Sequence, residues 1–350
     1  MAKALAATAA FNELIDTLNA IRDDYILSEE RFRDDLERVE GYRYVTHLLS
    51  EASELLAEAD TERPRFSSIV SPARKFLGDN PDALYQQAVI RGDRSYRVTG
   101  RRDGQVYISF TVHGADPAGG INGPVLADIN HHDIDIDADG NFELILSPNE
   151  HPGNWLKIDQ RARFVFVRNY FLNELSAQND PNVHVWINIE PLDDPGSPAP
   201  LSDADFASRL RDATAFLHAG TLGLRMFDAD STEPFSSNEL NTVGTPWSFR
   251  NANIDAAGAV DIFYSSGRFD LAPGKALVME GTLPHCEFVN VMLWNVHMQT
   301  LEYRFRQCSL NETQMKLDGD RGYRPIDVSW RDAGTEGSRA VDVVLARKRH

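Results

Sequence analysis

The chain contains few cysteines, no long hydrophobic run and fewer basic than acidic side chains. Two cysteines in 350 residues cannot form a disulfide framework or a cysteine-rich zinc site. No stretch approaches the roughly 18 consecutive apolar residues that a membrane-spanning helix needs. The first residues, MAKALAATAAFNEL, are too short and too weakly apolar for a secretory signal. We therefore expect a cytoplasmic protein without a membrane partner.

The charge balance excludes one large class of partners. Lys and Arg number 35 and Asp and Glu number 53, so the formal net charge is −18. Such a surface repels phosphate backbones, and we expect no nucleic-acid partner. The chain also has no Rossmann fingerprint, phosphate-binding P-loop, nucleophile elbow or H-E-x-x-H motif. The cofactor is therefore left open, with no nucleotide-binding motif visible.

Residues 1–78 are predicted to form an N-terminal helical segment. Apolar side chains recur at the spacing of an amphipathic helix, at positions Phe11, Leu14, Ile15, Leu18 and Ile21. Ser28, followed by Glu29 and Glu30, has the pattern of an N-cap with acidic residues in the first turn. The sequence therefore predicts a second helix that begins after Ser28 and stops before Pro64.

Residues 79–190 change from a helical period to strand alternation, which predicts the first antiparallel β-sandwich-like half. The expected strands lie at 95–99, 106–113, 134–137, 142–146 and 163–170. Residues 191–258 are predicted to contain a linker, a helix capped by Ser202 with Asp205 in its first turn, and a long loop. A second β-sandwich-like half should occupy 259–350, with strands at 260–264, 276–281, 287–300, 303–308, 323–329 and 340–346.

The two β regions share an order of elements that indicates an internal duplication. Residues 107–113 can be laid over 291–297, and in both copies an Asn precedes a Gly that leads into a strand. The predicted fold class is therefore α+β. It comprises two related antiparallel β-sandwich-like halves, an N-terminal helical segment and a helical connector.

The expected strand at 287–300 carries the leading candidate site. In a regular strand, one face is apolar around Leu293 and ends in Asn295, His297 and Gln299. Polar side chains at the mouth of an apolar wall are typical of a small-molecule pocket. His297 could act as a general acid or base, with Asn295 or Gln299 stabilising an oxyanion. The alternative is a hydrogen-bonded polar patch where the strand leaves the core.

Three tryptophans are candidates for the apolar wall of the same pocket, with core or rim packing as the alternative. They are Trp155, Trp186 and Trp247.

A second candidate is the polar cluster His131, His132 and Asp133, with His184 as a further partner. Such side chains can bind a transition metal. Adjacent residues of a strand point to opposite faces, so both histidines can serve one metal only if the chain bends there. The alternative is a hydrogen-bonded loop between sheets, and the sequence alone does not commit this cluster to a metal.

Five segments of the chain resemble proteins that carry the domain of unknown function 1214. They are EGYRYVTHLL, DNPDALYQQAVIRGDRSYRVTG, DIDADGNFELILSP, HPGNWLKIDQRARFVFVRNYF and GTLPHCEFVNVMLWNVHMQTLEYRFRQCSLN. The resemblance covers most of the chain. The first two segments are similar to the N-terminal part of single-chain bacterial members. Its Pro-Asn-Trp-Leu motif appears here once, as Gly153-Asn154-Trp155-Leu156, and the second copy is replaced by residues 330–337. The resemblance implies a β-rich fold and no particular reaction.

The leading hypothesis is a cytoplasmic enzyme that acts by acid–base chemistry on a small, partly apolar organic molecule bound between β layers. A hydrolase or a lyase/isomerase fits better than a redox enzyme, because no nucleotide fingerprint is visible. The alternative is a non-catalytic binding protein for a lipid-like or aromatic ligand, and a third reading is a purely structural role. A homo-oligomer is compatible with the sequence.

Overall fold

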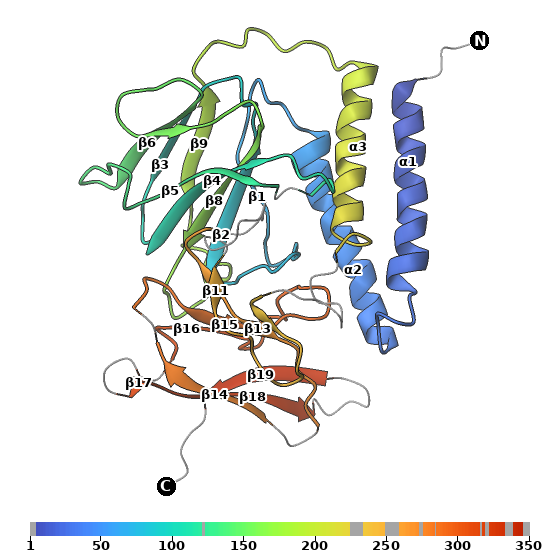
Figure 1. Ribbon diagram of the computed structural model, residues 1–350, viewed down its shortest axis with the longest axis vertical. Coiled ribbons are helices and arrows are strands. Elements are labelled where there is room, and N and C mark those ends of the chain that lie inside the picture. Colours follow the sequence, from blue (N-terminus) through green and yellow to red (C-terminus); the bar gives the residue numbers. More distant parts are fainter. Residues whose placement is uncertain are drawn as a thin grey trace.

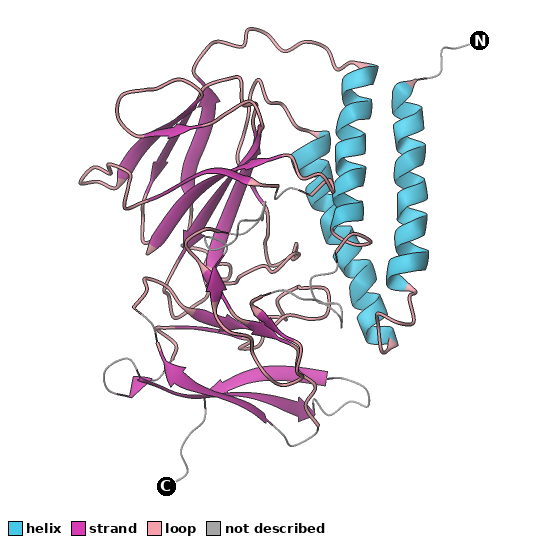
Figure 2. Ribbon diagram, in the orientation of Figure 1, coloured by secondary structure: helices cyan, strands magenta, loops and turns pink. Residues whose placement is uncertain are grey.

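The computed structural model describes residues 5–120, 123–224, 234–248, 259–272, 276–283, 285–315, 317–318, 322–332 and 339–345. Three helices stand beside a β-sandwich, and a second group of strands lies below that sandwich (Figure 1). Helices and sheets are segregated in space (Figure 2), and the paired strands are mostly antiparallel, which confirms the predicted α+β class. No helix among the described residues is long and apolar enough to cross a membrane.

Two of the helices belong to the N-terminal segment and the third to the connector. Helix α1 (Ala6–Ala20) continues into a π-helical turn, Ile21–Ile26, and α2 (Asp35–Glu51) into another, Ala52–Ala57. Helix α3 (Asp203–Ala219) packs against α1, and the Asp203 carboxylate accepts hydrogen bonds from the first amides of α1. The apolar stripe of α1 is only partly buried, because Phe11 and Ile15 are exposed.

One of the two predicted N-caps is correct. The Ser202 hydroxyl accepts a hydrogen bond from the Asp205 amide and caps α3 as expected. The predicted cap at Ser28 is wrong, because α2 begins at Asp35 and the Asp34 carboxylate accepts from the Glu37 amide. Asp34 followed by Glu37 is itself a capping pair, and it lies directly before the helix.

The first half is a sandwich of two sheets. In order across the sheet, the larger one contains β1 (Ser67–Ser68), β2 (Ala83–Val89), β8 (Ala162–Tyr170), β4 (Tyr107–Gly114) and β5 (Val125–Asn130). The smaller one contains β7 (Trp155–Lys157), β6 (Asn141–Ser147), β3 (Tyr96–Arg101) and β9 (Trp186–Pro191). Alternate apolar residues of both sheets, such as Phe110, Val167 and Leu144, form the core between them. The strand expected at 134–137 is absent, since that segment is a loop.

The second face of the five-stranded sheet is covered as well. Phe164 and Phe166 of β8 share a core with Phe216 of α3 and Leu48 of α2. The central strands are therefore buried on both faces. Polar side chains on the helix-facing side of β2, β4 and β8 consequently lie inside the molecule.

The second half contains shorter elements. They are β10 (Ser236–Ser237), β11 (Trp247–Ser248), β12 (Phe263–Tyr264), β13 (Ser266–Gly267), β14 (Ala276–Thr282), β15 (Asn290–Met292), β16 (Ser309–Asn311), β17 (Leu317–Asp318), β18 (Gly322–Asp332) and β19 (Arg339–Leu345). Strand β18 pairs with β14, β17 and β19. The β15–β16 pair contributes Leu310 to a small core with Leu293 and Cys308. Residues 225–233 and 249–258, parts of the predicted connector, lie outside the described residues.

The long strand predicted over 287–300 is wrong. Only Asn290–Met292 forms a strand, and the chain then makes a tight loop closed by a bridge between Trp294 and Thr300. Met298 has a φ of 56°, a left-handed conformation that a strand cannot contain. Residues 107–113 form one continuous strand, β4, so their proposed counterpart at 291–297 differs from them in backbone structure. The strand predicted at 303–308 is also absent.

Candidate functional site

The end of β5 brings two histidines to the same side of the chain. The strand stops at Asn130, whose carbonyl oxygen accepts a hydrogen bond from the Asp133 amide 3.0 Å away. The Asn130 side-chain oxygen also accepts from the His132 amide at 3.0 Å. This turn bends the backbone, and the rings of His131 and His132 lie with their centroids 4.1 Å apart. The bend that a shared metal requires is therefore present.

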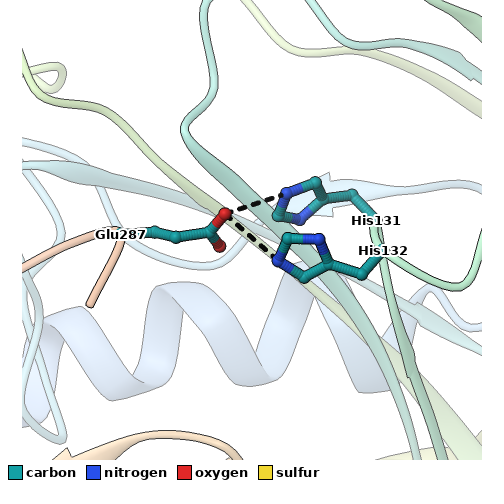
Figure 3. Close-up of side chains that lie close together, drawn as sticks. All are labelled: His131, His132 and Glu287. Atoms are coloured by element: carbon teal, nitrogen blue, oxygen red, sulfur yellow. Dashed lines mark ion pairs between the residues drawn. The ribbon is translucent and has the colours of Figure 1, made fainter. Parts of the chain in front are cut away.

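Glu287 of the second half completes the cluster (Figure 3). Its Oε1 lies 3.1 Å from Nε2 of His132 and 3.5 Å from Nε2 of His131. The three donor atoms all lie within 4.8 Å of one another. The cluster therefore joins the loop after β5 to the segment before β15.

These separations fit a metal ion. Metal–ligand bonds of about 2.0–2.1 Å at tetrahedral angles place neighbouring ligand atoms roughly 3.3 Å apart. The observed 3.1 and 3.5 Å lie on either side of that value. Two imidazoles and one carboxylate suit zinc and other first-row transition metals, and three protein ligands leave a coordination position for a substrate.

The electrostatics favour neutral imidazole at His131. Burial and the Arg102 charge lower the pKa of His131, while Glu287 opposes this shift. A neutral ring keeps a lone pair for a metal. Binding through Nε2 would place the proton on Nδ1 and give up the hydrogen bond that Nδ1 accepts from the Ile108 amide at 3.5 Å. A contact of that length is weak and permits this tautomer.

Solvent reaches the cluster on the side of His132 and Glu287. The side chains of His132 and Glu287 are 60% and 41% exposed, whereas that of His131 is 4% exposed. A metal at this position would therefore be anchored on a buried ring and remain open to solvent.

A carboxylate from the second half lies behind His131. Asp261 Oδ2 accepts hydrogen bonds from the Tyr107 hydroxyl and, at 3.0 Å, from Asn130 Nδ2. Its other oxygen, Oδ1, is buried and has no hydrogen-bond partner among the described residues. The Tyr107 ring contacts the His131 ring edge-on at 5.7 Å. Asp261 thus orients the wall on which His131 rests and keeps one acceptor unused.

The structure separates the four residues proposed for the metal cluster. His131 and His132 come together, but Asp133 and His184 lie outside the group. Asp133 is exposed and supports the turn through its amide, and His184 packs edge-on against Trp186 at 6.4 Å. Glu287 was missed, because no local spacing connects it with a loop far away in the sequence.

The residues of the predicted acid–base site do lie together, in the loop after β15. Asn295 Oδ1 accepts from the amides of His297 and Gln299, and its Nδ2 donates to Gln299 Oε1. Gln299 Nε2 donates to the Lys75 carbonyl at 2.8 Å. These contacts hold the loop in shape and fasten it to the N-terminal segment.

His297 itself is fully engaged by the helical segment. Its Nδ1 lies 2.8 Å from the Tyr25 hydroxyl and its Nε2 lies 2.7 Å from the Glu37 carbonyl. The ring is 1% exposed and packs among Tyr25, Phe32 and Tyr44. Burial lowers its pKa, although the Glu37 carbonyl opposes this shift. The geometry gives His297 a structural role, and its catalytic role stays a prediction.

The proposed apolar wall is dispersed. Trp155 and Trp186 lie on β7 and β9, the opposite edges of the four-stranded sheet. Trp247 of β11 packs against Phe235, and Leu293 is buried in the core of the second half. These residues do not share one wall.

The chain is similar in fold to solved proteins of no stated function. It matches an uncharacterized protein from Burkholderia cenocepacia with a TM-score of 0.79 and 27% identity, over 96% of this chain and 94% of that one. The VPA0106 protein from Vibrio parahaemolyticus aligns with a TM-score of 0.42 and 13% identity, over 85% and 87% of the two chains, which is too weak to carry an argument. No protein-family model and no curated protein matches the sequence. The comparisons therefore support the fold, and the function has to be argued from the residues of the candidate site.

Proposed function

We propose that the protein is a cytoplasmic metal-dependent enzyme that acts by acid–base chemistry on a small, partly apolar organic molecule. The observation that carries the proposal is the convergence of His131, His132 and Glu287 at metal-ligand separations. The reaction class stays a hydrolase or a lyase/isomerase. Membership of the family with the domain of unknown function 1214 belongs to the same proposal.

Each residue of the cluster has a distinct task. His131 would bind from a buried position fixed by Tyr107, and His132 and Glu287 would bind from the solvent side. A bound divalent ion supplies Lewis acidity that polarises a carbonyl group or a water molecule. Asp261, with one buried oxygen unpartnered among the described residues, is the nearby group that could accept a hydrogen bond from a bound molecule.

Calorimetric titration of chelator-treated protein with Zn²⁺ tests the metal centre. We expect one saturable site in the wild type, binding at least about tenfold weaker in Glu287→Gln, and no change in His184→Ala. His184 is the matched control, because it is an exposed histidine outside the cluster. No saturable binding, or equal affinity in Glu287→Gln, would contradict the proposal.

The reconstituted protein then separates an enzyme from a carrier. We expect hydrolysis of a model aryl ester to depend on added Zn²⁺ and to be lost in His132→Ala. Zinc binding without any metal-dependent turnover across esters and lactones would instead favour the non-catalytic binding protein for a lipid-like or aromatic ligand.

A further inference from the structure

A buried arginine without a carboxylate partner among the described residues lies in the middle of the five-stranded sheet. Arg168 of β8 is 6% exposed. Its Nη1 donates to Thr111 Oγ1 at 2.8 Å, and its guanidinium lies 4.3 Å from the centre of the Phe166 ring. No carboxylate of the described residues forms an ion pair with it, and Asp128 is joined to it only through Thr111 Oγ1, which donates to Asp128 Oδ2 at 3.1 Å. An arginine cannot lose its charge by deprotonation, so this burial is costly without an anion.

The strand register places hydroxyl groups directly beside this charge. Arg168 is paired with Tyr85 of β2 on one side and with Ser109 of β4 on the other. Residues opposite each other in an antiparallel pair project from the same face of the sheet. We call this group, with Tyr170, Tyr264 and His113, the Arg168 face.

Three tyrosines of the Arg168 face supply neutral hydroxyl donors. The hydroxyls of Tyr85 and Tyr170 lie 3.3 Å apart. Burial raises the pKa of both groups and of Tyr264, and the Arg168 charge opposes the shift in each case. All three therefore remain protonated near neutral pH, and all three lie within the electrostatic influence of Arg168.

Two buried polar atoms of the Arg168 face have no partner among the described residues. Ser109 Oγ is one: it lies near the Tyr107 hydroxyl without a hydrogen bond of regular geometry, in a side chain that is 1% exposed. His113 Nε2 is the other, because its Nδ1 faces the Gly123 carbonyl at 2.8 Å and takes the ring proton. Buried polar groups in native proteins are normally hydrogen-bonded, so these atoms are open to a ligand.

We propose that the Arg168 face binds the carboxylate of a small organic molecule. The Arg168 face provides one buried positive charge, which matches a monoanion, and a guanidinium binds a carboxylate through two parallel hydrogen bonds. Phe166, Tyr170 and Phe288 provide aromatic surface for an apolar or aromatic body of that molecule.

This site adjoins the candidate metal centre. The Tyr107 ring contacts the Tyr170 ring at 5.8 Å and the His131 ring at 5.7 Å. Phe288, the neighbour of Glu287, packs on Tyr170 at 4.7 Å. The inference that this carboxylate is the substrate rests on the proposed function. The reacting group of an aromatic or apolar carboxylate bound at Arg168 would have to extend past Tyr107 to the metal.

Binding of benzoate to chelator-treated full-length protein tests the Arg168 face without the metal. We expect saturable binding by calorimetry, and a roughly 10- to 100-fold loss in Arg168→Gln. Arg97→Gln is the matched control, because Arg97 is half-exposed on β3 and pairs with Glu143 and Glu190. Benzyl alcohol, which has no charge, should bind far more weakly than benzoate.

A second variant covers the case in which Arg168→Gln fails to fold. Ser109→Ala removes a hydroxyl that lies near the Tyr107 hydroxyl but makes no hydrogen bond of regular geometry among the described residues. It should leave the melting temperature unchanged while weakening benzoate binding severalfold.

Three outcomes would overturn the proposal. They are no saturable binding of benzoate, unchanged affinity in both variants, and tighter Arg168-dependent binding of phenyl phosphate, which would assign the site to phosphate. Benzoate binding in a protein that binds no Zn²⁺ would retain the anion site and remove only the metal-dependent function.

Discussion

His297 and the pair His131–His132 differ in what their ring nitrogens contact. Both nitrogens of His297 have partners within the protein, the Tyr25 hydroxyl and the Glu37 carbonyl. The Nε2 atoms of His131 and His132 both face one oxygen of Glu287. The two rings thus converge on one partly exposed carboxylate at separations that also suit metal ligands. The comparison shows that the partners of the ring nitrogens, rather than residue type, separate a structural histidine from a candidate ligand.

The largest expected loss of folding stability follows from replacing His297, whose two ring nitrogens are both hydrogen-bonded. His297→Ala removes two buried hydrogen bonds and leaves a cavity among three aromatic rings. We expect the free energy of unfolding to fall by about 3 kcal/mol or more, measured by urea denaturation. His184→Ala, an exposed control, should change it by less than about 0.5 kcal/mol. Near-wild-type stability of His297→Ala would contradict the structural role.

The same loop should make stability depend on pH. Asp79 Oδ1 accepts from the Thr300 amide at 2.8 Å, and burial raises the pKa of Asp79 from 3.8 to about 6. Because the folded pKa is the higher one, the folded state binds more protons between about pH 4 and 6, and Asp79 destabilises it as pH rises through this window.

Asp79→Asn keeps the acceptor and removes this titration. Relative to the wild type, the variant should gain about 3 kcal/mol of stability from pH 4 to pH 7, since one pKa unit corresponds to ~1.4 kcal/mol. Denaturation at both pH values measures the gain. A parallel pH dependence of the two proteins would show that Asp79 is not the titrating group.

The cluster of His131, His132 and Glu287 should make stability depend on a bound metal ion instead. Glu287 belongs to the second half and the histidines to the first, so a bound ion would join the two. At a free Zn²⁺ concentration of about 100 times Kd, we expect a gain of ~2.7 kcal/mol in the wild type. Thermal melts with and without a chelator measure it, and Glu287→Gln, which should bind at least about tenfold more weakly, should gain at most ~1.4 kcal/mol.

The smallest effect is expected at Trp186, a proposed pocket residue. Its side chain is 57% exposed on the edge strand β9, beside Arg101. Trp186→Ala should change the free energy of unfolding by less than about 0.5 kcal/mol and leave Zn²⁺ and benzoate affinity unchanged. A tenfold loss of either affinity would place a ligand at this edge.

The sequence predicts the parts of the fold that local signals determine. The Ser202 cap, four strands of the first half (β3, β4, β6 and β8) and the α+β class follow from neighbouring residues. Alternation of apolar and polar residues over 287–300 imitates a strand, but contacts with α2 and Lys75 stabilise a loop there. Glu287 and Arg168 could not be predicted as site residues, because their partners lie on remote segments that only the folded sheet brings together.

Elemental analysis of protein purified without added metal tests the central claim most directly. We predict about one transition-metal ion per chain in the wild type and in His184→Ala, and a substoichiometric amount in His132→Ala. His132 is exposed, so its loss should not unfold the protein. A metal-free wild type that also binds no added Zn²⁺ would contradict the claim, as would full metal content in His132→Ala.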